Sequence, residues 1–354
     1  MKPWESGIRK VTPYIPGEQP RISDIIKLNT NENPYPPSPA VEKVISGYPT
    51  ETLRLYPDPA CQVLVDAIAE YYGIGRDCVF VGIGSDDVLA LSFLTFFNQE
   101  LPILFPDITY SFYDVWAELY RIPFRRIPLD EGFAWHKEDY RIPNGGIVLA
   151  NPNAPTGLYA NLNDIEDVLS HNPDSIVIID EAYIDFGGTS ALPLLKKYDN
   201  LLIVQTFSKS RSLAGMRIGY AMGNPLLIRY LNDVKYSFNS YTMNRVTLEA
   251  GAAAIKDRDY FVQNCQNIIH TREESKKRLA RLGFSFPDSM TNFIFASHEH
   301  IDAEELFTAL KEHGIFVRHF GADRIKNYLR ITIGLPQQMD TLFDFLASYI
   351  EKHA

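Results

Sequence analysis

Short apolar runs of strand length alternate with amphipathic stretches between residues 60 and 225. The runs carry almost no polar residue, a pattern typical of strands that helices cover on both faces. In the stretches between them, apolar residues recur three or four positions apart, as on a helix that packs one face against a sheet. The predicted strands span residues 78–81, 103–105, 147–150, 176–179 and 201–204, and the predicted helices span residues 62–72, 86–97 and 163–169. We therefore expect an α/β fold built from repeated strand–helix–strand units.

The pattern changes after about residue 225, where longer helices and fewer strands follow. The predicted elements there are a helix over residues 258–281, a strand over 292–295, a helix over 303–313, a strand over 328–333 and a closing helix. A chain of 354 residues is about twice the commonest domain size, which favours two domains over a single core. We predict a three-layer large domain with a mostly parallel sheet over residues 32–245, and a smaller α+β domain formed by residues 1–31 and 246–354.

The composition, with 45% hydrophobic and 22% charged residues, is that of an ordinary soluble globular protein. A net charge of −10 argues against nucleic acid as a partner, because that binding depends on clustered Lys and Arg. No apolar run is long enough to cross a bilayer, and the first residues lack the apolar stretch of a signal peptide. We expect a cytoplasmic protein that binds small molecules, and neither nucleic acid nor membrane.

The cysteines and histidines suggest neither disulfides nor a metal site. The three cysteines, Cys61, Cys78 and Cys265, are an odd number at wide spacings, which fits a reducing compartment. His298 and His300 flank an acid in a polar stretch, with no further cluster of ligands nearby. We therefore predict that the protein holds no metal.

Two apolar strands end in residues that can carry chemistry. One runs into Asp180 and Glu181, and the other runs into Ser208 and Lys209. In parallel sheets, ligands collect beyond the carboxyl ends of the strands, so these side chains can meet in one pocket. A structural ion pair or ordinary helix caps would be the simpler explanation of either segment alone. The alternative is a pyridoxal phosphate site, which needs a lysine for the Schiff base and an acid that keeps the pyridine nitrogen protonated.

A phosphate cradle is available at residues 81–87 (VGIGSDD), which follow a strand and open a helix. The free N–H groups and the positive dipole end of such a helix bind anions, although an ordinary capped turn has the same pattern. A dinucleotide-binding turn fits less well, because its third glycine is absent and Asp86 and Asp87 would repel a pyrophosphate. A monophosphate needs a compensating cation there. Arg217, eight residues after Lys209, is our candidate, and Ser208 can add a hydrogen bond.

Several segments, taken together and in order, resemble the fold-type-I pyridoxal phosphate aminotransferases, and specifically the histidinol-phosphate aminotransferase branch. They are residues 28–34 (LNTNENP), 56–58 (YPD), 84–86 (GSD), 151–157 (NPNAPTG), 180–183 (DEAY), 208–209 (SK) and 329–331 (LRI). They span nearly the whole chain, and together they make a chance resemblance improbable.

The resemblance assigns roles around the cofactor ring. It makes Lys209 the Schiff-base lysine and the proton shuttle between the substrate α-carbon and the cofactor C4′. It pairs Asp180 with the ring nitrogen, places the Tyr183 hydroxyl near the ring O3′, and stacks Tyr110 on the ring face. The family usually has an asparagine before Pro-Thr-Gly that contacts O3′, where this chain has Ala154. Either Asn153 replaces that contact or Tyr183 acts alone; Asn153 can equally be a turn residue.

The resemblance also implies a phosphate site and a dimer. The backbone at Ser85 and Asp86, with Ser208 and Arg217, would hold the cofactor phosphate. Tyr56 matches the residue that the family lends to the phosphate site of the neighbouring subunit. We therefore expect a homodimer.

Arg330 matches the arginine with which aminotransferases of this fold hold the substrate carboxylate. In the histidinol-phosphate branch the substrate has no α-carboxylate, and a phosphate is bound instead. Arg318 supplies the added positive charge that a phosphate ester requires. We also assign Tyr14 and Asn33 to the substrate site, where the aromatic segment around Tyr14 and Tyr35 can close over an imidazole ring.

The leading hypothesis for function is amino-group transfer between L-histidinol phosphate and 2-oxoglutarate, a step of histidine biosynthesis. One alternative is an aromatic amino-acid aminotransferase, in which Arg330 holds a carboxylate. A second is a threonine-phosphate decarboxylase of the same superfamily, since the cofactor machinery is shared. A binding module without turnover is a third, and Lys209, Asp180 and Arg217 together count against it, because such a module has no chemical need for the lysine.

Overall fold

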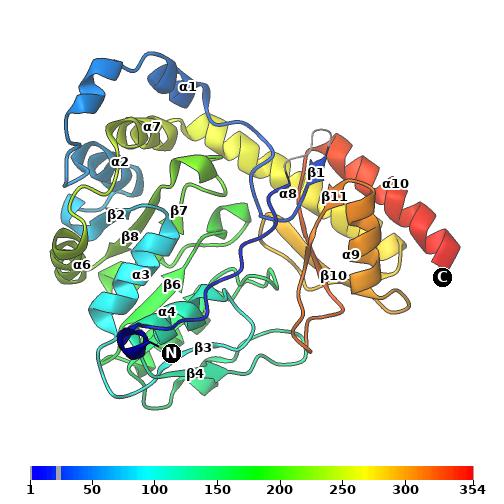
Figure 1. The fold of residues 1–354 in the computed structure, drawn as a ribbon, viewed down its shortest axis with the longest axis horizontal. Coiled ribbons are helices and arrows are strands. Elements are labelled where there is room, and N and C mark those ends of the chain that lie inside the picture. The colour runs from blue at the N-terminus through cyan, green and yellow to red at the C-terminus, as the bar shows by residue number, and fades with distance from the viewer. Residues whose placement is uncertain (1, 21–24, 354) are drawn as a thin grey trace.

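The computed structural model describes residues 2–20 and 25–353, which form a larger and a smaller part (Figure 1). The strands of the larger part are β2 (Val79–Gly82), β3 (Ile103–Pro106), β4 (Phe124–Ile127), β5 (Gly146–Ala150), β6 (Val177–Asp180), β7 (Leu201–Thr206) and β8 (Gly219–Gly223). They lie in the order β2-β8-β7-β6-β5-β3-β4. β8 runs antiparallel to both of its neighbours, while the pairs among β7, β6, β5, β3 and β4 are parallel. The prediction of a mostly parallel sheet is confirmed.

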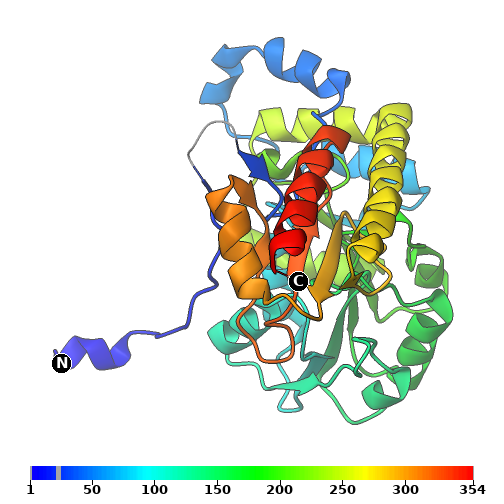
Figure 2. The ribbon, with the colours of Figure 1, turned by 90° about the vertical axis from the view of Figure 1, so that its right-hand side faces the viewer.

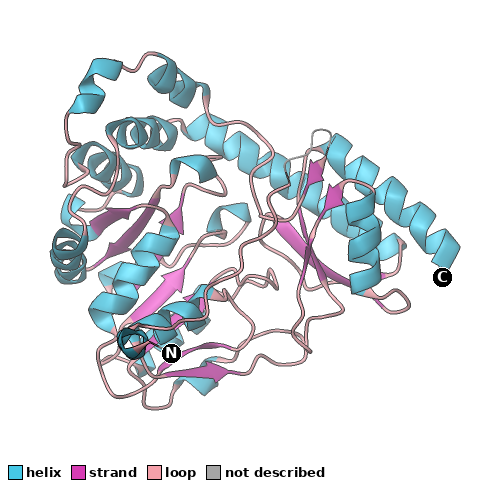
Figure 3. Cartoon of the chain, in the orientation of Figure 1, coloured by secondary structure: helices cyan, strands magenta, loops and turns pink. Residues whose placement is uncertain are grey.

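Helices cover both faces of this sheet, which gives the predicted three layers (Figure 3). One face packs against α2 (Gln62–Tyr72), α5 (Leu162–His171) and α7 (Arg245–Lys256), and α1 (Pro39–Ser46) lies on α7. The other face packs against α3 (Ser85–Phe96), α4 (Phe112–Tyr120) and α6 (Pro225–Phe238). Each face has its own apolar core, as the apolar runs of the strands predicted.

The alternation of side chains along β6 decides which of its two terminal acids faces which core. Ile178 belongs to the core beside α3 and α4, whereas Ile179 belongs to the opposite core. By the same period of two, Asp180 points to the α4 side, where Tyr113 donates to it, and Glu181 points to the other side. The strand therefore presents one acid, not both, to a ligand on the α3–α4 side.

The smaller part is an α+β structure with a separate core. Its elements are α8 (Arg258–Arg281), β9 (Phe284–Ser285), β10 (Phe293–His298), α9 (Ala303–Glu312), β11 (Ile315–Phe316), β12 (Arg318–His319), β13 (Leu329–Thr332) and α10 (Pro336–His353). The strands β12, β13, β10 and β9 form an antiparallel sheet in that order. β1 (Ile26–Lys27) pairs in parallel with β11, which attaches the early chain to this part. The predicted smaller α+β fold is confirmed.

The exact division of the chain at residue 245 stays a prediction. Buried side chains of α7, including Leu248 and Ile255, pack in the core of the large sheet, although that division assigns α7 to the small domain. Residues 1, 21–24 and 354 of the predicted small domain lie outside the described residues. We propose a boundary between α7 and α8.

The helices α2 and α8 have the bounds that the sequence predicted. Two strands of the large sheet, β4 and β8, were not predicted. β4 is an edge strand with exposed arginines, and β8 is built largely from small residues, so neither has a fully apolar run. The segment that carries the short helix Pro3–Gly7 extends away from the body of the protein (Figure 2). No helix of the described residues is long and apolar enough to cross a membrane.

Candidate active site

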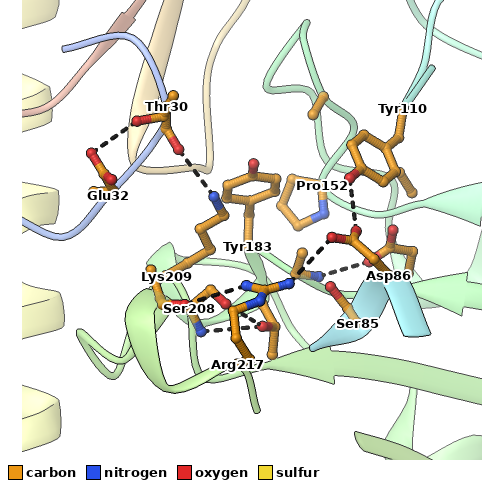
Figure 4. A pocket seen from close by; sticks show the side chains of 16 residues that line it. Thr30, Glu32, Ser85, Asp86, Tyr110, Pro152, Tyr183, Ser208, Lys209 and Arg217 are labelled. Atoms are coloured by element: carbon orange, nitrogen blue, oxygen red, sulfur yellow. Dashed lines mark hydrogen bonds and ion pairs between the residues drawn. The ribbon is translucent and has the colours of Figure 1, made fainter. Parts of the chain in front are cut away.

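A cavity of about 180 Å³ lies beyond the carboxyl ends of β5, β6 and β7, at the start of α3 (Figure 4). The predicted cofactor residues that line it are Ser85, Asp86, Tyr110, Asp180, Tyr183, Ser208, Lys209 and Arg217. They come from separate strands, loops and one helix start, so the fold brings distant segments to one place. Asn153 and Tyr56, also predicted as cofactor residues, do not line it.

Lys209 has its amine inside this cavity. Its Nζ donates to the carbonyl oxygen of Thr30 at 3.2 Å and lies 5.7 Å from the centroid of the Tyr183 ring. The backbone of the lysine is held by Asn33, whose amide donates to the carbonyl oxygens of Lys209 and Ser210 at 3.0 and 3.2 Å. We predicted that Asn33 binds substrate, but its amide hydrogens already bind this loop. Asn33 thus positions the lysine.

Asp180 is a buried acid whose carboxylate has no lysine or arginine within 4 Å among the described residues. Tyr113 donates to one oxygen at 2.8 Å, and the backbone N–H of Ala182 donates to the other at 3.2 Å. Burial raises the pKa of Asp180 to about 6, and these two hydrogen bonds oppose the rise. A cationic group placed beside this carboxylate would lower that pKa, so the site is ready to pair with a protonated ring nitrogen.

The turn into α3 has backbone N–H groups that can bind an anion. The first N–H groups of a helix have no intrahelical acceptor, and the capping residue Gly84 has no side chain to bind them. Gly84 has a φ of +83°, and a Cβ on it would lie 2.4 Å from the Arg217 guanidinium. A Cβ on Gly219 would lie 2.2 Å from the backbone N of Ser85. Both glycines therefore allow the turn, Arg217 and β8 to approach each other closely.

The acids at the start of α3 have different partners. Asp87 turns back and accepts from the backbone N–H of Ile83 at 2.9 Å, away from the cavity lining. Asp86 stays in the cavity, where it accepts from the Tyr110 hydroxyl at 2.8 Å and lies 3.4 Å from Arg217. The guanidinium therefore compensates an acid already in place, and its remaining donors are available to an anion.

Asn153 lies outside the cavity lining and is held by its own loop and by the loop that follows β3. Its NH₂ group donates to the Ile108 carbonyl at 3.0 Å and to Thr156 Oγ1 at 2.9 Å, and its Oδ1 accepts from Thr109 at 2.8 Å. Both amide hydrogens are used, so Asn153 has none left for a cofactor. This placement counts against the prediction that Asn153 replaces the asparagine missing at Ala154, and it favours the alternative that Tyr183 acts alone.

Arg318 and Arg330 lie opposite each other on the paired strands β12 and β13. Both guanidinium groups lie 5.7 Å from the centroid of the Phe320 ring, and within the described residues neither has a carboxylate within 4 Å. Arg330 is half-buried; it donates to the Asn29 carbonyl at 3.1 Å, and its buried Nε has no hydrogen-bond partner among the described residues. Burial, with the charge of Arg318, lowers the pKa of Arg330. The pair is a cationic site without a protein anion.

The two remaining predicted aromatic residues lie outside the cavity lining. Tyr14 stacks on Phe112 with ring centroids 4.2 Å apart. Tyr56 is 76% exposed and packs on Tyr241 with ring centroids 4.7 Å apart. An exposed Tyr56 cannot serve the cavity of its own chain.

Three residues of the segment LNTNENP contribute to the site although the sequence pattern did not predict them. Thr30 and Glu32 line the cavity, and Asn31 donates to the Tyr183 hydroxyl at 2.9 Å. Burial raises the pKa of Glu32, but hydrogen bonds from Lys27 and Thr30 outweigh it and hold the pKa below the usual value. The sequence signal that could have indicated them is the run of polar residues between Leu28 and Pro34.

His298 has a structural position. It is buried, its Nε2 lies 3.1 Å from the Leu282 carbonyl, and its ring packs on Phe284. Within the described chain, no group of three or more His, Cys, Asp or Glu side chains is placed to hold a metal ion.

A lysine and a buried acid at the carboxyl ends of a mostly parallel three-layer sheet, beside a small α+β part, define a transferase of the fold-type-I class. Residues 23–346 match the family model described as aminotransferase class I and II. The chain belongs to that family and is an aminotransferase.

Curated relatives match almost the whole chain. The histidinol-phosphate aminotransferase of Lactococcus lactis subsp. cremoris (strain MG1363) is 53% identical over 348 residues, which is 98% of each protein. The histidinol-phosphate aminotransferase 1 of Methylococcus capsulatus is 51% identical over 351 residues, 99% of this chain and 98% of that protein.

Solved structures share the fold. The histidinol-phosphate aminotransferase from Sinorhizobium meliloti in complex with pyridoxal-5′-phosphate has a TM-score of 0.84 at 24% identity and covers 93% of this chain and 92% of that one. The L-threonine-O-3-phosphate decarboxylase from Porphyromonas gingivalis has a TM-score of 0.79 at 22% identity and covers 92% and 100%. At these identities the likeness establishes the fold and does not separate the two reactions.

Proposed function

We propose that the protein is a pyridoxal phosphate-dependent histidinol-phosphate aminotransferase, which moves an amino group between L-histidinol phosphate and 2-oxoglutarate in histidine biosynthesis. The observation that carries the choice of substrate is the pair Arg318 and Arg330, two guanidinium groups with no carboxylate within 4 Å among the described residues. Neither lines the cavity, but Arg330 packs on Phe293, whose ring contacts Tyr183 in the cavity wall. A phosphate ester, with more than one negative charge, balances two such cations better than a single carboxylate does. The curated relatives at about 50% identity support the same substrate.

The residues of the cavity fit pyridoxal phosphate. When bound, the cofactor supplies an electron sink for charge that develops at the carbon bearing the amine. Asp180 is a buried acid that lacks a cation, which suits the pyridine nitrogen. The start of α3 and Arg217 suit the phosphate, and Lys209 offers its amine between them.

Each residue then has a task on the substrate. Lys209 Nζ would take the proton from the carbon that bears the amine and deliver it to the cofactor C4′, and it would move a proton in the opposite direction in the second half of the cycle. Asp180 keeps a proton on the ring nitrogen by its negative charge. Arg330 and Arg318 hold the substrate phosphate, and so fix the reacting carbon relative to Lys209.

The substrate assignment is tested by half-reactions without an acceptor. The visible absorbance of the holoenzyme is followed after addition of histidinol phosphate, unphosphorylated histidinol, phenylalanine or threonine phosphate. We expect the fastest loss of absorbance with histidinol phosphate. Faster reaction with phenylalanine would support the aromatic aminotransferase instead, and release of carbon dioxide from threonine phosphate would support the decarboxylase.

Arginine variants connect this preference to the site. Arg330→Lys removes the planar fork and keeps one charge, so the KM for histidinol phosphate should rise roughly tenfold to a hundredfold, and that for histidinol much less. Arg278→Lys is the matched control, because Arg278 pairs with Asp340 at the surface of the same part. Equal effects on both substrates would contradict phosphate recognition.

We further propose that the protein is a cytoplasmic homodimer in which Tyr56 of one copy completes the phosphate site of the other. Tyr56 packs on Tyr241 in an exposed apolar area that also includes Leu53 and Leu55, while Phe238, also near Tyr241 in the chain, is 73% exposed. Such surface is usually covered in an assembly. Sedimentation of the holoenzyme tests the dimer.

A further inference from the structure

The hydroxyl of Tyr183 is held by a residue from the opposite end of the chain. Asn31 donates its side-chain N–H to Tyr183 Oη at 2.9 Å, and both residues are buried. Asn31 has a φ of +56°, a region in which asparagine and aspartate are the most tolerated side chains. Its carbonyl oxygen accepts from Asn292 at 2.9 Å, which further fixes the segment. Asn31 is therefore built into the fold and is not a loosely placed surface amide.

The direction of the hydrogen bonds around Asn31 is set by its backbone. The backbone N–H of Asn31 donates to Thr332 Oγ1 at 3.1 Å, and this hydroxyl donates to Asn31 Oδ1 at 3.0 Å. If the amide were turned over, its NH₂ group would face Thr332 and leave a buried hydroxyl proton without an acceptor. The NH₂ group therefore faces Tyr183. Because an amide NH₂ group cannot accept, the Tyr183 oxygen must do so.

The proton of the Tyr183 hydroxyl is thereby left for another acceptor. Among the described residues no protein atom accepts it, and Tyr183 lines the cavity together with Lys209 and Ala154. The methyl group of Ala154 offers no hydrogen bond in the same wall. Thr332, Asn31 and Tyr183 thus form a hydrogen-bonded relay. The relay leaves the Tyr183 hydroxyl as a hydrogen-bond donor in the wall where Ala154 replaces the family's usual asparagine.

We propose that Asn31, oriented by Thr332, is a positioning residue that forces Tyr183 to donate its hydroxyl proton to the phenolic oxygen of the cofactor ring. This inference rests on the proposed function, since it concerns the same cofactor. Thr332 lies two residues beyond Arg330 on β13, so the relay also ties the substrate-binding strand of the small part to the cofactor wall. Asn31 acts through Tyr183 and makes no contact with the reacting atoms itself.

The test uses the holoenzyme and reads the pH midpoint of its visible absorption. A donor to the phenolic oxygen favours loss of the proton that this oxygen shares with the Lys209 nitrogen, so losing the donor raises the midpoint. Asn31→Asp keeps the size and the backbone conformation but replaces the donor with an acceptor, which turns the Tyr183 proton away. We expect the midpoint to rise by about one pH unit and the apoprotein to bind pyridoxal phosphate several-fold more weakly.

Two substitutions of Thr332 test the relay without introducing a charge. Thr332→Val removes the hydroxyl that orients the amide and should raise the midpoint by a smaller amount, whereas Thr332→Ser keeps the hydroxyl and should match the wild type. Thermal unfolding of each apoprotein establishes that the variants fold. If the pH midpoint of the visible absorption is that of the wild type in both Asn31→Asp and Thr332→Val, the proposal is overturned.

A double variant separates the relay from the charge of the new carboxylate. In a Tyr183→Phe background, Asn31→Asp should cause no further shift if it acts through the tyrosine hydroxyl. A shift of equal size in both backgrounds would overturn the proposal, because it would show a direct effect of charge. Failure of the proposed function is distinguishable. Without the cofactor, the wild-type protein would have no visible absorption at all, and with a different substrate the half-reaction with histidinol phosphate would be slow while the absorption midpoints of the variants still test Asn31.

Discussion

Gly219 sets the shape of the proposed phosphate site without contacting a ligand. A Cβ at this position would lie 2.2 Å from both the carbonyl carbon of Gly84 and the backbone N of Ser85, whereas ordinary contacts begin near 3.4 Å. Both atoms are backbone, so no side chain can rotate out of the way. Gly219→Ala must displace the turn or the strand by about 1 Å.

A displacement of that size lengthens a hydrogen bond from the turn to the phosphate beyond its useful range. One hydrogen bond to a charged group contributes about 1.5–3 kcal/mol, so the Kd of the Gly219→Ala apoprotein for pyridoxal phosphate should rise roughly tenfold to a hundredfold. The binding of pyridoxal, which lacks the phosphate, should change little. Titration of the two ligands into apoprotein, followed by absorbance, measures both effects.

Gly215 provides the matched control in the same loop. A Cβ on Gly215 meets nothing within 4 Å, so Gly215→Ala should bind both ligands as the wild type does. Thermal unfolding of the apoproteins separates a local change from loss of the fold. The reasoning is refuted if Gly219→Ala binds pyridoxal phosphate with wild-type affinity, or if its loss is as large for pyridoxal.

Three further predictions concern the acids and the dimer. Burial raises the pKa of Asp180 to about 6, so the carboxylate becomes protonated between pH 7 and pH 5 and the affinity of the apoprotein for pyridoxal phosphate should fall over that range. The Asp180→Asn protein should bind pyridoxal phosphate weakly at every pH, and its affinity should change only as the ligand itself titrates. Burial raises the pKa of Glu181 from 4.5 to about 7, so its contribution to stability is full below pH 4.5 and is lost as the pH rises through 7. Urea unfolding at pH 5 and pH 8 should show the wild type losing up to about 3 kcal/mol relative to Glu181→Gln, and no change would contradict the burial argument. Mixing inactive Tyr56→Ala and Lys209→Ala proteins should restore activity through mixed dimers with one intact site; no recovery after subunit exchange would contradict the shared site.

The period of the apolar residues was sufficient to predict the layers of the fold. Strands β5, β6 and β7 are apolar on both faces because helices cover both, and this makes them readable in sequence. Strand β4 could not be recognised in this way, because an edge strand exposes its arginines to water. Strand β8 could not be recognised either, since three of its five residues are small and one of them, Gly219, allows the close approach to the turn at Gly84.

The site residues that directly follow apolar strands could be predicted from the sequence. Lys209 and Asp180 follow apolar strands, so their position beyond the sheet follows from the pattern. The roles of Asn33 and Asn153 could not be read from sequence, because an amide that binds backbone looks the same as one that binds a ligand. Asn31 was missed because its effect depends on Thr332, about 300 residues away in the chain.

The central claim is that Lys209 carries pyridoxal phosphate, and one measurement tests it most directly. The holoenzyme is treated with borohydride, which makes the link between cofactor and lysine permanent, and the digested protein is mapped by mass spectrometry. We expect the added cofactor mass on the peptide that contains Lys209, and the loss of both this mass and the yellow colour in Lys209→Ala. A label on another lysine, or no label on a coloured protein, would contradict the account.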